Sequence, residues 1–219
     1  LVADVGGELL RSGLPGFREV VVAVPRRSGK TALILAWELH RALMWGRPQS
    51  IAYTAQTGQD ARKKLVEDQY DKLLLHTPLR SAIRQVKRAA ADTAMLFKNG
   101  SRIDVLATSA EAGHGKTLDL GVIDEAFADE DFRREQALRP TMATRADAQI
   151  LVLSTAGTDK SVFLNQKVEA GRAAVTRGLT EGLAYFEWSA PEGVDVHDPG
   201  EWWGWMPALG RTITPAVVQ

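Results

Sequence analysis

The chain has 219 residues, of which 45% are apolar and 25% charged, a composition typical of a globular protein rather than of a disordered or low-complexity chain. Lysine and arginine together number 27, as do aspartate and glutamate, which excludes the strong overall positive field of a basic nucleic-acid-binding arm. The lack of cysteine excludes disulfides, thiolate nucleophiles and cysteine-ligated zinc. No apolar run approaches the ~20 residues of a membrane span and no signal-peptide pattern opens the chain, so we expect a soluble intracellular protein without membrane contact.

The first part of the chain alternates between strand and helix patterns. Residues 18–24 form a short β-branched apolar run, which is typical of a strand buried on both faces. Residues 31–45 carry apolar side chains at helical spacing and end at a glycine-containing stop signal. Residues 50–55 predict a second strand and residues 59–75 a second helix.

The middle of the chain predicts a basic helix followed by a β-hairpin. Residues 79–88 are interpreted as a short helix whose basic side chains have no acidic partner. Residues 93–97 and 102–107 are strand-like and flank Asn99 and Gly100, an Asn-Gly pair that strongly favours a tight hairpin turn. We expect this hairpin to be an insertion in the fold.

Two further apolar strands are predicted at residues 118–124 and 149–155, with a helix at 131–142 between them and a last helix at 161–177. Because strands and helices alternate, the sequence predicts an α/β fold in which helices flank a mostly parallel sheet.

The composition changes near the end of the chain. Between Arg177 and Arg211 there are six acidic residues, four of the six tryptophans, and no lysine or arginine. We therefore expect a core over residues 1–178 and a small C-terminal lid or linker over residues 179–219. Packing of the tryptophans against the core is favoured over stacking on nucleic-acid bases.

A phosphate-binding loop is predicted between the first strand and the first helix. Such a loop wraps backbone N–H groups around a phosphate at the positive end of a helix. A lysine in it reaches the outer phosphates and a Ser/Thr hydroxyl ligates Mg²⁺, roles that fall here to Lys30 and Thr31. Its residues are Pro25, Arg26, Arg27, Ser28, Gly29, Lys30 and Thr31.

Two features qualify this motif. Val24 stands where the pattern usually has its first glycine, and an ordinary basic strand-to-helix loop is the alternative interpretation. A second Gly-Lys-Thr at residues 115–117 is followed by a strand pattern, so no helix N-terminus is expected there to receive a phosphate.

Acidic and hydroxyl residues follow the two later strands. Asp124 and Glu125 end an apolar strand, where Asp124 can hold Mg²⁺ and Glu125 can orient and polarise an attacking water. The alternative is that both merely begin the next helix. Ser154 and Thr155 end the following strand, where they can contact the γ-phosphate or form an ordinary turn.

The strings VPRRSGKT, LGVIDEA and LSTAG, in this order, resemble the ATPase domain of the large terminase subunit of tailed double-stranded DNA bacteriophages, especially the HK97-like group. The resemblance extends over about residues 18–210. It implies a P-loop NTPase fold of the ASCE type, with Arg26 as the arginine four positions before Lys30. Asp124 and Glu125 match the Walker B aspartate and the catalytic glutamate. The coupling motif corresponds to Ser154, Thr155 and Ala156.

This resemblance implies an ATP-hydrolysing motor that uses ATP and Mg²⁺ to move double-stranded DNA into a procapsid. It also implies a homo-oligomeric ring on a portal, a small terminase subunit as partner, and a location in the bacterial host cytoplasm. Nothing after Ser161 resembles the strand-borne acidic triad of the nuclease domain that follows in this family. We therefore expect no DNA cleavage by this chain alone.

Several roles are left open. Residues 1–17 contain no glutamine, so the usual adenine-reading residue is unassigned. The arginine that several relatives direct at a neighbouring subunit's nucleotide has only His114 or Lys116 as replacement candidates. Candidate contacts to DNA phosphates, each also consistent with a solvated surface, are Arg80, Arg84, Lys87, Arg88, Lys98 and Arg102.

Two other functions stay possible at the level of sequence. The motifs also resemble those of superfamily 2-like helicases or translocases, although too few residues follow Glu125 to complete this domain and add a second. A nucleotide-binding assembly module without efficient turnover is the other alternative, and the presence of Glu125 argues against it. The four histidines share no spacing that favours a metal site.

Overall fold

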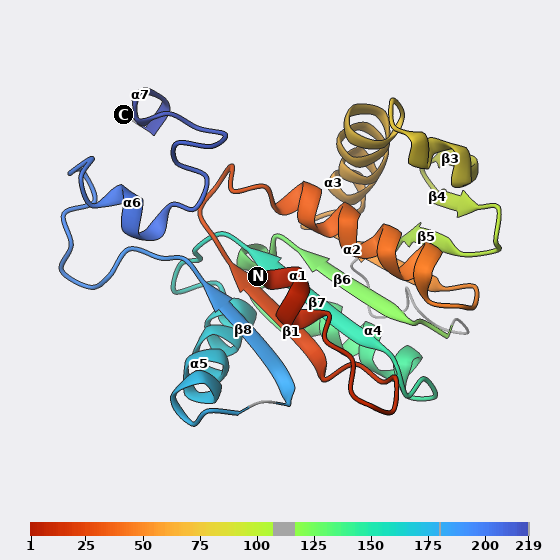
Figure 1. Cartoon of the computed structure of the whole chain (residues 1–219), viewed down its shortest axis with the longest axis horizontal. Coiled ribbons are helices and arrows are strands. Elements are labelled where there is room, and N and C mark those ends of the chain that lie inside the picture. Colours follow the sequence, from red (N-terminus) through yellow and green to blue (C-terminus); the bar gives the residue numbers. More distant parts are fainter. Residues whose placement is uncertain (107–116, 180, 219) are drawn as a thin grey trace.

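The computed structural model describes residues 1–106, 117–179 and 181–218, which form one eight-stranded sheet in the order β3-β4-β5-β2-β6-β7-β1-β8 (Figure 1). All neighbouring strands are parallel except the pairs β3/β4 and β4/β5. The predicted α/β class with a mostly parallel sheet is confirmed. The strands are β1 (Phe17–Ala23), β2 (Ser50–Thr54), β3 (Ile83–Ala89), β4 (Asp92–Phe97), β5 (Arg102–Val105), β6 (Leu120–Asp124), β7 (Gln149–Ser154) and β8 (Gly182–Glu187).

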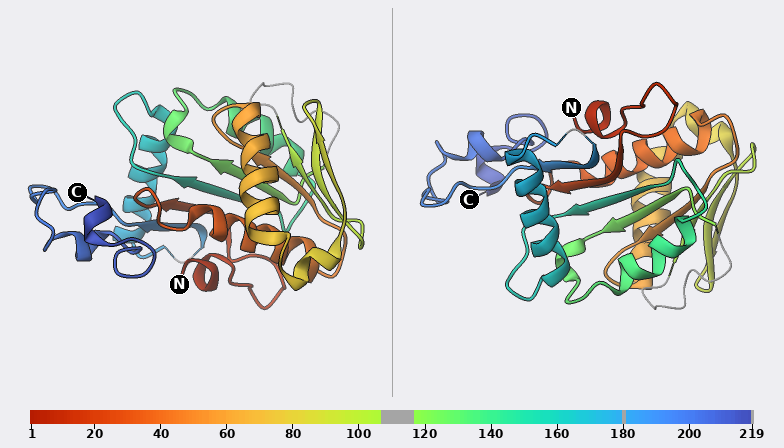
Figure 2. Two further views of the ribbon diagram at one scale, coloured as in Figure 1. Left: turned by 90° about the horizontal axis from the view of Figure 1, so that it is seen from above. Right: turned by 90° about the horizontal axis from the view of Figure 1, so that it is seen from below.

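Helices cover both faces of the sheet, with α2, α3 and η1 on one side and α4 and α5 on the other (Figures 1 and 2). No helix in the described part of the chain has the length and apolar character needed to cross a bilayer. The helical segments are α1 (Val2–Gly6), α2 (Lys30–Met44), α3 (Gly58–Lys63), η1 (Lys64–Leu74), η2 (Pro78–Ala82), η3 (Ala126–Ala128), α4 (Arg133–Met142), α5 (Val162–Thr176), α6 (Trp202–Trp205) and α7 (Pro215–Val218).

The central strands are apolar throughout because both of their faces are buried. In β1, Val20 and Val22 enter the core under α2 and η1, while Val21 enters the core under α4 and α5. All three are at most 1% exposed. Burial of apolar surface stabilises a fold by roughly 25 cal/mol per Å². The buried strands therefore hold together the sheet whose edge carries the polar residues described below.

The predicted helix over residues 59–75 is present but changes its winding. It begins as α3 and continues from Lys64 to Leu74 as the π-helix η1. Leu75 N donates to Tyr70 O at 2.8 Å, the five-residue step that defines this wider helix. Such segments are rare and occur often at functional sites.

The prediction of a helix over residues 79–88 is wrong. The chain forms the short 3-10 helix η2 and then the edge strand β3, in which Val86 lies opposite Met95 of β4. Pairing with β4 thus overrides the local helical pattern. Charged side chains along an exposed edge strand also hinder pairing with other chains.

The Asn-Gly hairpin is confirmed between β4 and β5. Gly100 adopts φ +90°, which a side chain would disfavour, and Asn99 Nδ2 donates to Ala42 O at 2.7 Å. However, β5 also pairs in parallel with β2. The hairpin is therefore an extension of the main sheet and does not stand apart from it.

The end of the chain combines a sheet strand with a separate small cluster. β8 pairs in parallel with β1, and Trp188 N donates to Ala23 O at 2.8 Å. Farther on, Trp202 and Met206 pack in a cluster of their own, which lies beyond the β8 edge (Figure 1). One element of the expected appendage over residues 179–219 thus lies in the sheet, while the division of the chain itself stays a prediction.

Candidate active site

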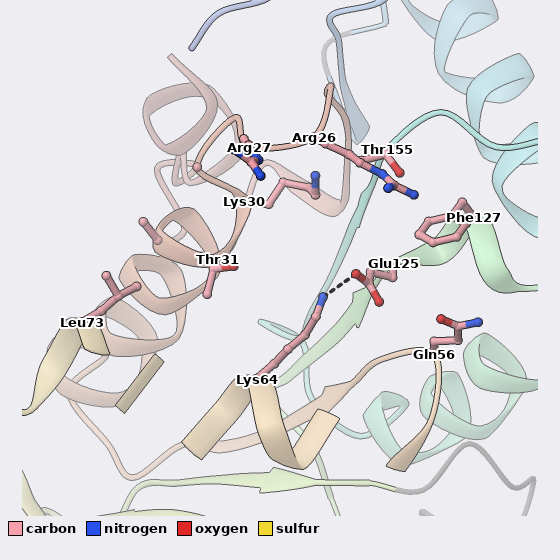
Figure 3. A pocket seen from close by; sticks show the side chains of 12 residues that line it. Arg26, Arg27, Lys30, Thr31, Gln56, Lys64, Leu73, Glu125, Phe127 and Thr155 are labelled. Atoms are coloured by element: carbon pink, nitrogen blue, oxygen red, sulfur yellow. Dashed lines mark ion pairs between the residues drawn. The ribbon is translucent and has the colours of Figure 1, made fainter. Parts of the chain in front are cut away.

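A cavity of about 720 Å³ opens at the carboxyl ends of the central strands (Figure 3), where open α/β sheets bind their ligands. It combines the loop after β1, the end of β6, the end of β7 and the start of η1. Its lining residues are Arg26, Arg27, Gly29, Lys30, Thr31, Ala32, Gln56, Lys64, Leu73, Glu125, Phe127 and Thr155. Residues from the three separate motifs in the sequence therefore meet at one place.

The loop after β1 presents an uncapped helix N-terminus to this cavity. Val24 N donates to Ser154 O at 3.0 Å, which ties the loop to the end of β7. Arg27 and Gly29 then adopt φ of 62° and 80°, so the loop turns without needing a glycine at Val24. Gly29 occupies the N-cap position of α2 but has no side chain with which to make a capping hydrogen bond. The first backbone N–H groups of the helix can therefore bind an anion.

Lys30 points into the cavity (Figure 3), where its Nζ lies 3.5 Å from Pro25 O. Burial lowers its pKa, and the positive charges of Lys64 and Arg26 act in the same direction, against the attraction of Asp124 and Glu125. A ligand that carries negative charge would relieve this repulsion between cations. The electrostatics thus favour a polyanion here.

Asp124 is 2% exposed, and both of its oxygens are engaged. Oδ2 accepts from the Tyr53 hydroxyl at 2.7 Å and from Lys64 Nζ at 2.8 Å, and Oδ1 accepts from Glu125 N at 2.9 Å. Burial and the nearby charge of Asp124 raise the pKa of Tyr53 well above its usual value, which keeps this hydroxyl a donor.

Glu125 reaches the cavity from a strained backbone. Its φ of 55° lies in the left-handed region, which costs a residue other than glycine free energy and is enriched at active sites and ligand-binding segments. It precedes the short helix η3 but makes no capping bond with its side chain. Instead, Glu125 Oε1 pairs with Lys64 Nζ at 2.8 Å (Figure 3).

The end of β7 is bonded to the segment that follows Glu125. Ser154 Oγ accepts from Phe127 N at 2.9 Å and donates to Thr155 O at 2.7 Å, and Phe127 O accepts from Ser161 Oγ at 2.6 Å. Thr155 lines the cavity, whereas Ala156 is exposed. The predicted coupling residues therefore begin at a direct hydrogen bond between the end of β7 and η3.

Sequence reasoning missed Lys64 and Tyr53. Each belongs to an ordinary segment, one on a helix rich in lysine and one in an apolar strand, and neither is part of a recognisable motif. Their polar atoms meet Asp124 only because η1 packs over the sheet. No sequence signal beyond their residue types identifies them.

The predicted DNA-contacting residues lie on η2, β3 and the β4–β5 hairpin, outside the set that lines the cavity. The expectation that the predicted helix lacks acidic partners is wrong. Lys87 pairs with Asp92 at 2.6 Å and Arg88 with Asp71 at 2.7 Å, and Arg102 Nε donates to Asp104 at 2.6 Å.

The trans-acting candidates His114 and Lys116 lie outside the described residues. The same is true of most of the second Gly-Lys-Thr, of which only Thr117 is described.

Thr31 and Asp124 fit a partial magnesium site. A hydroxyl and a carboxylate are the hard oxygen ligands that Mg²⁺ prefers, and this ion usually completes its shell with phosphates and water. Among the described residues there is no group of three or more His, Cys, Asp or Glu side chains placed to hold a metal by themselves. Any ion bound here would therefore depend on the ligand it accompanies.

Solved structures of phage proteins share this fold. The large terminase of bacteriophage HK97 superposes with a TM-score of 0.77 at 16% identity, covering 93% of this chain and 42% of that one. The ATPase domain of the Thermus phage P74-26 large terminase gives 0.58 at 16% identity, covering 84% and 82%. The large terminase of another thermophilic bacteriophage, in complex with ATP-gamma-S, gives 0.55 at 14% identity, covering 85% and 43%. The fold is thus the P-loop NTPase fold of terminase ATPase domains.

A comparison with curated proteins finds no match, and the chain spans less than half the length of the HK97 terminase. The family model described as "Terminase large subunit, T4likevirus-type, N-terminal" matches residues 22–170, more than half of the chain and the whole series of strands from β2 to β7. The chain therefore belongs to the family of N-terminal domains of phage terminase large subunits.

Proposed function

We propose that this chain is the ATP-hydrolysing motor domain of a viral DNA-packaging terminase. The convergence of Lys30, Thr31 and Glu125 in one cavity at the sheet edge supports this proposal most strongly. Family membership and the ADP and ATP-gamma-S complexes of the similar thermophilic phage terminase add to it. Hydrolysis of Mg-ATP would then drive translocation of double-stranded DNA into a procapsid.

In the proposed reaction, the backbone N–H groups of residues 26–30 and the Lys30 ammonium bind the β- and γ-phosphates of ATP. Arg26, which lines the same cavity, stabilises the charge that develops on the transferred γ-phosphoryl group. Magnesium, when bound, neutralises phosphate charge, and Thr31 and Asp124 would hold it.

Glu125 is the proposed group that orients water for attack and accepts its proton. Release of phosphate would alter the contacts of Thr155 at the cavity wall. Ser154 would pass this change to the Phe127 segment through the hydrogen bonds described above. Residues 154–156 thereby couple the nucleotide state to the rest of the chain.

Translocation requires an assembly in this proposal. We propose a homo-oligomeric ring on a portal in the host cytoplasm, with a small terminase subunit as partner and duplex DNA in the centre. A basic edge, with contacts to DNA phosphates that are independent of sequence and sensitive to salt, is proposed from Arg80, Arg84, Lys87, Arg88, Lys98 and Arg102.

Steady-state ATP hydrolysis tests the proposal in the wild type, Lys30→Ala, Glu125→Gln and the control Glu169→Gln, an exposed residue on α5. We expect Glu125→Gln to bind a fluorescent ATP analogue but to lose turnover by about 10²–10⁴-fold. Lys30→Ala should lose binding as well, and the control should match the wild type.

A series of protein concentrations, with and without duplex DNA, extends this test. Turnover that rises more than linearly with protein concentration would support a catalytic group supplied by a neighbouring subunit. Unchanged turnover in Glu125→Gln would contradict the catalytic assignment. Nucleotide binding without turnover sensitive to Glu125 would instead favour an assembly module that binds ATP.

A further inference from the structure

Lys64 makes ion pairs with both acids of the site. Its Nζ lies 2.8 Å from Asp124 Oδ2 and 2.8 Å from Glu125 Oε1. The side chain extends from the first residue of the π-helix η1 into the cavity, where Figure 3 shows it directed at Glu125. One ammonium group from a different element therefore bridges two neighbouring carboxylates at the end of β6.

This bridge compensates the negative charge of a buried carboxylate. Asp124 is 2% exposed, and burial of a carboxylate without a partner is strongly unfavourable. Lys64 Nζ lies within ion-pair distance of both carboxylates and supplies the positive charge that offsets this cost.

The bridge also fills the bonding capacity of the Asp124 oxygen that it contacts. A carboxylate oxygen has two lone pairs, and Oδ2 already accepts from Tyr53 and Lys64, while Oδ1 accepts from Glu125 N. A divalent cation that takes Oδ2 must therefore displace Lys64. Tyr53 is the less mobile of the two donors, because it is fully buried in β2 whereas the Lys64 side chain is 19% exposed.

We propose that Lys64 is a built-in counter-cation that holds Asp124 and Glu125 in a resting ion pair and competes with Mg²⁺ for Asp124. Lys64 is then a positioning residue. It must release Asp124 when the metal enters, and its departure frees Glu125 at the same moment. This inference rests on the proposed function, and it adds a step at which metal entry controls when the glutamate becomes available to orient water.

The first test uses thermal unfolding without nucleotide, with Mg²⁺ alone as the probe at constant ionic strength. In Lys64→Met, which keeps the length and apolar character of the stem, the unpaired carboxylates should bind Mg²⁺. The unfolding midpoint should then rise by about 2–4 °C. The wild type and Lys63→Met, which changes the exposed neighbouring lysine, should not respond.

Two further variants make this result specific. Lys64→Arg keeps a cation and, like the wild type, should not respond to Mg²⁺, while Lys64→Met/Asp124→Asn should lose the response again. A midpoint in Lys64→Met that does not respond to Mg²⁺, or a response that survives in the double variant, would overturn the proposal.

The second test measures binding of a fluorescent ATP analogue as Mg²⁺ is titrated. We expect the half-saturating Mg²⁺ concentration to fall about tenfold in Lys64→Met and to stay at the wild-type value in Lys63→Met. Weaker analogue binding in Lys64→Met even without Mg²⁺ would show that Lys64 is instead a phosphate ligand. Because the first test needs no nucleotide, its result is independent of whether the chain hydrolyses ATP.

Discussion

Tyr53 illustrates how a single buried side chain supports a proposed metal ligand without touching the cavity. Its hydroxyl donates to Asp124 Oδ2 at 2.7 Å, and the ring belongs to the main core. Hydrogen bonds to charged groups contribute more than neutral ones. The position of Asp124 therefore depends on a residue in β2, the strand that pairs with β6.

We predict that Tyr53→Phe lowers the free energy of unfolding by about 1–2 kcal/mol, since the buried carboxylate loses a donor while the ring is retained. ATP turnover should fall as well, because Asp124 is less firmly held. Denaturant unfolding and steady-state hydrolysis measure the two effects. Tyr185→Phe is the matched control, since its hydroxyl bonds to Glu187, a residue that does not line the cavity, so it should change stability but not turnover.

The residues of the site differ in how far the sequence could predict them. Lys30 and Thr31 lie in one contiguous motif whose strand-to-helix context is visible locally, and Asp124 follows an apolar strand. The arrangement at the cavity, however, depends on side chains brought in by packing. Lys64 could not be predicted, because its role follows from the position of η1 over the sheet.

At the scale of elements, α5 and β8 are joined by a compact set of polar contacts. Glu187 accepts from Arg172 at 2.6 and 2.9 Å, from the Tyr185 hydroxyl at 2.7 Å and from Ser189 Oγ at 2.6 Å. The bonds from Arg172, against the effect of burial, lower the pKa of Glu187 to about 2, with help from Ser189 and Tyr185. This carboxylate therefore fastens the last strand to the helix before it.

The lowered pKa gives a pH dependence of stability with a definite sign. Because the folded pKa lies below the usual 4.5, the contribution of Glu187 is full above about pH 4.5 and is lost as the pH falls toward about 2. Glu187→Gln should cost about 1 kcal/mol at pH 7, a modest value because Arg172 is exposed and screened. Urea unfolding at pH 7 and pH 3 measures this, and a cost as large at pH 3 as at pH 7 would contradict it.

The elements also show where local sequence patterns mislead. The continuous apolar runs of β1 and β7 predict buried strands correctly, because both faces are covered and no alternation is needed. The basic residues of β3 resemble a solvated helix face, so the local pattern favours a helix there. Its pairing partner β4 lies beyond a turn, and that pairing decides the structure.

At the scale of the whole molecule, β8 and the following residues differ in how they join the core. β8 completes the sheet beside β1, while Trp202, Met206 and Leu209 form a cluster separate from the two main cores. The boundary predicted after residue 178 would leave β8 outside the core. We therefore propose that the appendage begins later, after Ser189.

Two truncations test this boundary. A chain that ends at Ser189 should unfold within a few degrees of the full chain, since the sheet and both main cores are retained. A chain that ends at residue 178 exposes the edge of β1 and should unfold at a clearly lower temperature or fail to fold. Circular dichroism melting compares the two, and equal destabilisation by both truncations would show that the terminal cluster is part of the core.

The left-handed backbone at Glu125 has a consequence for how this domain can evolve. Glycine adopts that conformation without the cost that a side chain carries, so the residue proposed to activate water is not the one that the backbone prefers there. Selection for stability alone would favour Glu125→Gly, whereas selection for the proposed ATP hydrolysis would reject it. At position 125, stability and the proposed activity are thus opposed, and an inactive variant there can be more stable than the active protein.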